Sequence, residues 1–274
     1  MLPQTREIKV DAMKRIAETV LFAGMMITGM LSCSEAATYM YNVPAGTTQT
    51  FIGDYTYSKA AYPKYSNAGI NIGEGAQINV GSLTERTIFA NNADPSVITG
   101  GAIYNPRGYI NSIINTLFQE NHAKRGGAIF NNKTIRSGSI SFSDFIKNTA
   151  TQNGGAIYSA GELPTITSSN FSSNEAFGET RGDVGYGGAI CAENDLEITN
   201  SNFTNNHAYT KGGAIAMKKG NLTVIATDGN TSNFSGNIQS YAKTTQNNND
   251  IYMGGSGQIL KLHAIGANST INLE

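Results

Sequence analysis

The 274-residue chain contains no tryptophan, six prolines and two cysteines, and only 14% of its residues are charged. Cys33 and Cys191 lie far apart, which predicts neither a disulfide framework nor a cysteine-based metal site. The formal net charge is −1 and no basic patch is present, so nothing indicates a nucleic-acid partner. Long stretches with helical spacing of apolar residues are also missing, which argues against a helical repeat.

The first 36 residues resemble a secretion signal. Lys14 and Arg15 form its positive end, and residues 20–31 (VLFAGMMITGML) form an apolar core. A membrane-spanning helix needs about 20 apolar residues, so this core is too short to cross a bilayer. We therefore interpret residues 1–36 as a signal peptide.

The processing of this signal region is open. Met13 is a second candidate for the true start of the chain. Residues 34–36 (Ser-Glu-Ala) match the small-x-small pattern of signal peptidase cleavage. The alternatives are a lipoprotein with Cys33 as the lipid anchor, and a buried amphipathic helix.

Two four-residue motifs recur along most of the chain. Phe-x-x-Asn occurs six times, at Phe89/Asn92, Phe118/Asn121, Phe145/Asn148, Phe171/Asn174, Phe203/Asn206 and Phe234/Asn237. Gly-Gly-Ala-Ile occurs five times, with its glycines at Gly100/Gly101, Gly126/Gly127, Gly154/Gly155, Gly187/Gly188 and Gly212/Gly213. Such a repeat makes each copy one unit that must stack on its neighbours to bury its apolar face.

Alignment on the phenylalanine exposes further columns. A hydroxyl residue stands two positions before each one: Thr87, Thr116, Ser143, Ser169, Ser201 and Ser232. An alanine stands five positions after it in four copies: Ala123, Ala150, Ala176 and Ala208. An aromatic residue follows Gly-Gly-Ala-Ile in three copies, at Tyr104, Phe130 and Tyr158. Cys191 fills that position in a fourth copy, which favours packing over reactivity.

The period and composition of the repeat predict an all-β fold. Short β-branched or aromatic segments between glycine and asparagine turns are typical of strands. A unit of about 25–30 residues suits a coil of three short strands and three turns, and successive coils pair in parallel about 4.8 Å apart. We therefore predict a single-stranded parallel β-helix, right-handed by the crossover rule for parallel strands.

Each column then has a predicted physical role. The phenylalanines stack inside, and each contributes about 2 to 3 kcal/mol when fully buried. The asparagines form a ladder at a turn, where a positive φ is tolerated and the amide bonds to the next coil. The glycine pair allows a tight turn or a close backbone approach. Alternation along the strand places the alanine and isoleucine on opposite faces, with the isoleucine inward.

The remaining segments flank the repeats. Residues 37–80 are predicted to cap the solenoid and supply its first strands, since an uncapped end exposes strand edges. Residues 81–248 form the repeat β-helix. Residues 249–274 form terminal coils, and the strand pattern that runs up to Glu274 suggests a truncated end.

The paired Phe-x-x-Asn and Gly-Gly-Ala-Ile motifs resemble the polymorphic outer membrane protein repeat family over roughly residues 85–240. Residues 249–253 (Asn-Asp-Ile-Tyr-Met) resemble an ending found in autotransporter passenger domains. The resemblance implies a β-helical passenger that is exported to the outer membrane surface or released. It also implies adhesion to host cells, in which both tetrapeptide motifs take part.

These features predict a structural, adhesive protein rather than an enzyme. The implied partners are a host-cell surface protein or glycan and the outer membrane export machinery, with self-association through the solenoid edges as a further contact. Residues 175–186 and 241–249 are the loops best placed for contact, because insertions leave the core. No cofactor, metal or catalytic residue is predicted.

The alternative is a β-helical carbohydrate-active enzyme, a polysaccharide lyase or hydrolase. Such chemistry needs acidic residues clustered on neighbouring coils. The column of Asp144 offers no second acid, since its other members are Ile88, Leu117, Asn170, Asn202 and Asn233. His122 and His207 share a column three coils apart, too far to share a metal. Glu175 lies one coil from His207, and we expect a solvated surface pair.

Overall fold

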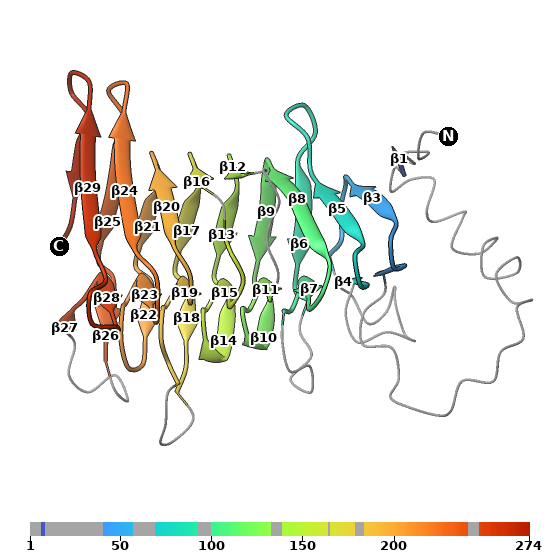
Figure 1. Cartoon of the computed structure of the whole chain (residues 1–274), viewed down its shortest axis with the longest axis horizontal. Helices are drawn as coiled ribbons and strands as arrows, with labels where there is room; N and C mark the ends of the chain where they lie inside the picture. The colour runs from blue at the N-terminus through green and yellow to red at the C-terminus, as the bar shows by residue number, and fades with distance from the viewer. Residues whose placement is uncertain are drawn as a thin grey trace, which may run out of the picture.

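The computed structural model describes residues 7–8, 41–56, 69–92, 100–132, 139–163, 165–178, 184–240 and 247–274. All regular elements in these ranges are β-strands, and Figure 1 shows them stacked along one long axis. This part of the chain contains no helix that is long and apolar enough to span a membrane. The signal-peptide prediction for residues 1–36 lies outside the described residues, apart from the short strand β1 (Glu7–Ile8).

The strands form four sheets, which we number in the order in which one coil visits them. Sheet 1 contains β1, β3 (Thr48–Phe51), β5 (Gln77–Val80), β8 (Tyr109–Ile114), β12 (Ile140–Ser141), β16 (Ile166–Thr167), β20 (Leu196–Thr199), β24 (Leu222–Thr227) and β29 (Leu260–Ile265). Sheet 2 contains β6 (Thr87–Ala90), β9 (Thr116–Gln119), β13 (Asp144–Ile146), β17 (Asn170–Ser172), β21 (Asn202–Thr204), β25 (Thr231–Ser235) and β30 (Thr270–Asn272).

The other two sheets complete the coil. Sheet 3 contains β10 (His122–Arg125), β14 (Thr149–Asn153), β18 (Glu175–Ala176), β22 (His207–Ala208), β26 (Ile238–Gln239) and β27 (Asn247–Asn248). Sheet 4 contains β2 (Tyr41–Val43), β4 (Ile70–Ile72), β7 (Ile103–Asn105), β11 (Ile129–Asn131), β15 (Ile157–Ser159), β19 (Ile190–Ala192), β23 (Ile215–Met217) and β28 (Ile251–Met253). Pairing is parallel between successive coils, while β26 and β27 pair antiparallel.

The predicted parallel solenoid is confirmed, but the prediction of three strands per coil is wrong. One coil runs through β12, β13, β14 and β15, with one strand in each sheet. The additional corner separates sheets 1 and 2. It is formed by the residue before the hydroxyl column, at Asn115, Phe142, Ser168 and Asn200, with φ angles of 47°, 51°, 48° and 49°. These residues share no chemical type, so the left-handed position itself was not predicted, although the hydroxyl column follows it directly.

The positive φ expected at the ladder asparagines lies one residue earlier. Glu120, Lys147 and Ser173, which precede ladder asparagines, have φ angles of 54°, 54° and 56°. A left-handed residue turns the chain sharply at this point. The next residue then points inward, which carries its amide into the ladder.

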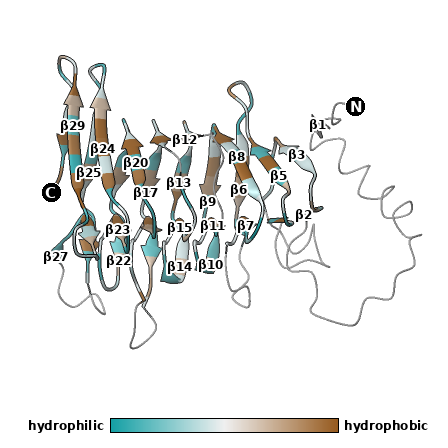
Figure 2. Ribbon diagram, in the orientation of Figure 1, coloured by the Kyte–Doolittle hydropathy of each residue, from teal (hydrophilic) through white to brown (hydrophobic). Residues whose placement is uncertain are grey.

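The phenylalanine column forms a continuous stack inside the solenoid, as predicted. Phe145 and Phe171 stack with centroids 4.5 Å apart and an angle of 2° between their planes, and Phe171 and Phe203 at 4.7 Å and 1°. Tyr55 extends the stack beyond Phe89 at 4.8 Å. Figure 2 shows the hydrophobic residues concentrated on the strands around this core. The fully buried rings of the column are Phe89, Phe118, Phe145, Phe171, Phe203 and Phe234.

The isoleucine of Gly-Gly-Ala-Ile points inward, as predicted, but the alanine does not face away from the core. Ala156 and Ile157 are both fully buried in the same hydrophobic cluster. The strand β15 starts at Ile157, so Ala156 belongs to the corner and not to the alternating strand. The corner turns the alanine inward as well.

Candidate binding surface

The asparagine column is a hydrogen-bonded ladder inside the solenoid wall. Asn148 donates from Nδ2 to Asn174 Oδ1 at 3.0 Å and to Phe118 O at 2.9 Å. Its Oδ1 accepts from the backbone N–H and the Nδ2 of Asn121, at 3.1 and 2.9 Å. Asn148 is fully buried, so the pattern satisfies its whole amide without water.

The same pattern extends to both ends of the motif series. Asn92 donates from Nδ2 to Asn121 Oδ1 at 3.0 Å and to Tyr55 O at 3.2 Å. Asn206 donates from Nδ2 to Asn237 Oδ1 and to Phe171 O, both at 2.9 Å. The buried ladder contains every asparagine of the motif: Asn92, Asn121, Asn148, Asn174, Asn206 and Asn237. The side chains expected to take part in adhesion are therefore covered by the wall, and a partner does not reach them in the folded chain.

Asn237, the last asparagine of the motif series, bonds to a residue outside the asparagine column. Asn237 donates from Nδ2 to Asp250 Oδ1 at 2.8 Å, and the Glu274 N–H donates to Asp250 Oδ2 at 2.8 Å. Asp250 accepts in both contacts, which suits a carboxylate. Burial raises the pKa of Asp250, while the hydrogen bonds from Asn237 and Glu274 act against this shift.

The hydroxyl column forms a second internal ladder. Ser143 Oγ donates to Ser141 O at 2.9 Å and accepts the Thr116 N–H at 3.1 Å. Ser169 repeats the arrangement with Thr167 and Ser143. The hydroxyl therefore replaces a backbone partner at the corner between sheets 1 and 2. The recurrence of a hydroxyl residue in the sequence did not by itself predict this hydrogen bonding.

The first glycine of each Gly-Gly-Ala-Ile motif turns the chain with a left-handed backbone. Gly154 has φ +66°, and its counterparts in the other copies have φ between +59° and +67°. This is the tight turn predicted for the motif, and a residue with a Cβ is strained there. The first glycines are Gly100, Gly126, Gly154, Gly187 and Gly212.

The second glycine lets neighbouring coils approach closely. A Cβ on Gly155 would lie 2.0 Å from Gly188 O and 2.6 Å from the Glu175 backbone N. A Cβ on Gly101 would lie 2.3 Å from Gly127 O, and one on Gly127 would lie 2.3 Å from Gly155 O. In the last copy, a Cβ on Gly213 would lie 2.6 Å from the Ile238 backbone N in sheet 3.

Both motifs thus belong to the wall and core of the solenoid. The second glycines Gly101, Gly127, Gly155, Gly188 and Gly213 are buried, like the phenylalanines and asparagines. The adhesive role implied for these residues by the resemblance remains a prediction. Any partner must contact the outer faces or the loops.

The outer face of sheet 2 carries a polar ladder along the solenoid axis. Its register aligns Leu117, Asp144, Asn170, Asn202 and Asn233 on successive coils, as the sequence predicted. Asn202 donates to Asn170 Oδ1 at 3.0 Å, and Asn170 donates to Asp144 Oδ1 at 2.8 Å. Asp144 also forms an ion pair with Arg86. This face is regular, polar and accessible.

Sheet 3 carries a buried group where a solvated pair was expected. His207 Nδ1 lies 2.7 Å from Glu175 Oε1 and Nε2 lies 2.8 Å from Ser240 Oγ, with the His207 and Glu175 side chains 10% and 19% exposed. The order carboxylate, imidazole, hydroxyl is that of a hydrolase triad. Ser240 is only 1% exposed, so a substrate does not reach its Oγ. The group ties three coils together.

His122, three coils from His207, lies in a different setting. Its Nδ1 is 2.7 Å from Thr149 Oγ1, and burial lowers the pKa of the imidazole. Among the described residues no group of three or more histidine, cysteine or acidic side chains could hold a metal ion.

The three matched segments of the Chlamydia polymorphic membrane protein repeat follow this architecture. They cover residues 115–132, 142–160 and 200–218. Each begins at the corner before sheet 2 and continues through sheets 2, 3 and 4. The chain carries polymorphic membrane protein repeats. The resemblance inferred from the two motifs is therefore confirmed.

One curated relative is similar to part of the chain. It is the probable outer membrane protein pmp8 of Chlamydia pneumoniae, 38% identical over 132 residues. The match covers 44% of this chain and 14% of the relative. No solved structure matches the chain.

The aromatic column after Gly-Gly-Ala-Ile lies outside sheet 4, on the outer side of the polymorphic membrane protein repeats. Phe130 and Tyr158 stack at 5.5 Å, and Cys191 is buried in the same cluster. Tyr158 donates from its hydroxyl to Glu193 Oε1 at 2.6 Å. Burial raises the pKa of the phenol most, and the Glu193 carboxylate raises it further. The packing role predicted for Cys191 agrees with its burial.

The two predicted contact loops are only partly described. Residues 175–176 form β18 inside the wall, so the first insertion begins later than predicted. Tyr186 packs into the outer aromatic cluster and its N–H donates to Asn153 Oδ1 at 3.0 Å. In the second loop, residues 247–248 form β27. Residues 179–183 and 241–246 lie outside the described part of the chain.

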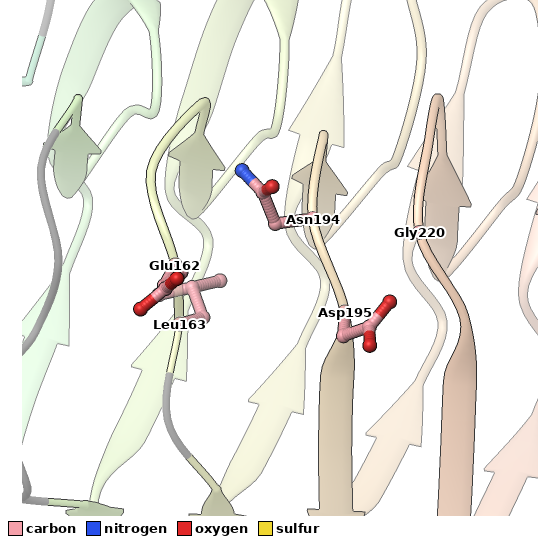
Figure 3. A pocket seen from close by; sticks show the side chains of 5 residues that line it. All are labelled: Glu162, Leu163, Asn194, Asp195 and Gly220. Carbon is pink, nitrogen blue, oxygen red and sulfur yellow. The ribbon is translucent and has the colours of Figure 1, made fainter.

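The loops between sheets 4 and 1 form a hollow that the sequence did not reveal. It has a volume of about 460 Å³ and is lined by Glu162, Leu163, Asn194, Asp195 and Gly220. Figure 3 shows the Glu162 and Asp195 carboxylates directed away from each other. Asp195 Oδ1 accepts the Asn221 N–H at 2.7 Å, which holds the loop in place. Two carboxylates acting on one glycosidic bond would have to face it together.

Proposed function

We propose that the chain is the β-helical passenger of a polymorphic membrane protein that acts in adhesion at the bacterial surface. The observation that carries the proposal is the combination of the family's repeats with a solenoid whose motif columns all point inward. This leaves long outer faces, and several contacts along one face favour multivalent binding. The role is structural and binding rather than catalytic.

The relative's name as an outer membrane protein supports an outer membrane or extracellular location for this chain. Export through outer membrane machinery and a host-cell protein or glycan as partner are parts of the same proposal. The alternative of a carbohydrate-active enzyme has no facing pair of carboxylates to support it in the described hollow.

Binding to epithelial cells tests the adhesive function. The purified, labelled chain is expected to bind saturably. Replacement of residues 179–183 and 241–246 by glycine-serine linkers of equal length tests the loops without touching a motif column. A variant with Phe145, Asn148 and residues 154–157 scrambled tests the motifs, with circular dichroism to report the fold.

We expect the motif variant to lose binding only together with its β-sheet signal, because its residues are buried. If that variant stays folded and loses binding, the motifs contact the partner directly. A well-folded parent chain that binds no cell type contradicts the adhesive function.

We also propose self-association of a second copy through the last coil. All residues of β29 are exposed, including Leu260 at 38%, Leu262 at 47% and Ile265 at 54%. Figure 1 places this strand at the end of the stack, and a parallel edge with free apolar side chains pairs readily with another chain.

Leu262→Lys is expected to lower the average mass measured by light scattering at micromolar concentration, because a charge on the edge opposes pairing. Leu83→Lys is the control, since Leu83 is 73% exposed but lies away from this edge. Equal effects of the two substitutions, or a monomeric parent chain, would contradict pairing through β29.

A further inference from the structure

Phe142 is an aromatic side chain in an unusual place. It occupies the corner between sheets 1 and 2, where the other copies have Asn115, Ser168 and Asn200. Its side chain is 55% exposed and its φ is 51°. A left-handed backbone costs a residue with a Cβ about 1–2 kcal/mol, and a bulky side chain there is a true outlier.

Packing does not explain this choice of residue. Phe142 is more than half exposed, so its ring gains little from the core, and asparagine would suit both the backbone and the solvent better. Strained residues of this kind concentrate at functional sites. The outlier therefore points to a role for the exposed ring.

The corner at Phe142 leads directly into β13, the strand of sheet 2 that carries Asp144 of the polar ladder. Asp144 follows two residues later on the outer face, and the ladder continues through Asn170 and Asn202 on the next coils. Asn170 uses one N–H and one lone pair inside the ladder and Asn202 uses one N–H, while a primary amide has two of each. The remaining groups offer donors and acceptors side by side at each coil, about 4.8 Å apart.

The charge of this patch restricts the ligand. Asp144 is paired with Arg86, whose side chain is 42% exposed. Leu117 on the preceding coil is apolar, and Asn170 and Asn202 on the following coils are neutral amides. Such a surface gives no attraction to a polyanion or a polycation. It suits a neutral ligand with many hydroxyl groups and an apolar face that can lie on an aromatic ring.

We propose that Phe142 and the Asp144–Asn170–Asn202 ladder form a binding site for a neutral glycan that runs along the solenoid axis. The proposal deepens the adhesive function and rests on it. The ring stacks on the apolar face of one sugar, and the amides exchange hydrogen bonds with the hydroxyl groups of the following ones. A flat protein surface is the competing partner, but the patch offers it one exposed aromatic anchor, since Leu117 and Ile146 on the same face are half-buried.

Titration calorimetry of the full chain tests the site with three probes: an N-acetyllactosamine tetrasaccharide, maltotetraose and a heparin tetrasaccharide. At least one neutral probe is expected to bind and the heparin probe is not. Phe142→Ala should weaken binding about tenfold through loss of stacking, and Asn170→Ala about threefold to tenfold through loss of one hydrogen bond. Leu83→Ala removes an apolar side chain that is even more exposed, at 73%, elsewhere on the chain and should leave the affinity unchanged.

Phe142→Asn separates loss of the site from damage to the fold. Asparagine suits the left-handed backbone, so this variant should melt at a higher temperature than the parent chain and still fail to bind. No binding of any neutral probe, or equal binding by the Phe142→Ala variant, overturns the glycan site. If the Phe142→Asn variant adheres to cells as the parent does, the adhesive function stands but does not use this site, which overturns the proposed role of the site in adhesion.

Discussion

Gly155→Ala is expected to destabilise the chain by more than about 3 kcal/mol, the upper end of the range for overpacked cores. The new methyl group would lie 2.0 Å from Gly188 O and 2.6 Å from the Glu175 backbone N. Both atoms belong to the backbone of the next coil, so no side chain can rotate away. The coils would have to separate, which breaks hydrogen bonds along the wall. Urea unfolding followed by circular dichroism measures the loss.

Gly46→Ala is the matched control. Gly46 has φ +70°, and a Cβ there meets nothing within 4 Å. This substitution should destabilise the chain by only about 1–2 kcal/mol, which is the cost of a left-handed backbone at a residue with a Cβ. Equal losses for the two variants would mean that close approach between coils does not explain the second glycine of the motif.

Asn148→Ala is expected to cost about 3 kcal/mol or more. The substitution removes four hydrogen bonds. The backbone N–H and the Nδ2 of Asn121 lose their acceptor, and Phe118 O and Asn174 Oδ1 lose the Asn148 Nδ2 donor. Each buried group left without a partner costs about 1–3 kcal/mol, and part of this cost is recovered by relaxation or by a trapped water. The same urea titration measures the change.

Two comparisons make this result specific. Asn170→Ala removes an exposed amide from the outer face of sheet 2 and should cost less than about 1 kcal/mol. Asn148→Asp keeps the shape but replaces a double donor by an acceptor, so it should destabilise even though it creates no cavity. If Asn148→Asp proved neutral, the hydrogen bonds of the ladder would not be the source of its stability.

The identity of a ladder residue depends on which of its neighbours lie within the wall. Asn148 has a coil on each side and must donate and accept, which an amide does. Asp250 lies outside the asparagine column and only accepts, from Asn237 and from the Glu274 N–H. A carboxylate therefore serves at Asp250, where it would fail at Asn148.

Much of the architecture was predictable because the repeat places identical residues above one another. The phenylalanine stack, the asparagine ladder and the parallel register all follow from recurring columns, and each was confirmed. The same register also aligned Asp144 with neutral neighbours, as predicted.

Features without a repeated residue type were not predictable. The corner at Phe142 is occupied by asparagine or serine in other copies, so the fourth strand of the coil was missed. The burial of His207 against Glu175 and Ser240 depends on three coils at once. The hollow at Glu162 and Asp195 is built from loops that share no pattern.

Periodicity alone is thus enough to define a stacked β-solenoid and the residues that point into it, because stacking requires the same side chain on every coil. Contacts between coils decide which way the corners turn, which polar groups are buried and which face is left for a partner. Those contacts bring together residues 26 to 35 positions apart, such as Asn170 with Asp144 and Tyr158 with Glu193, and they exist only once the chain has folded.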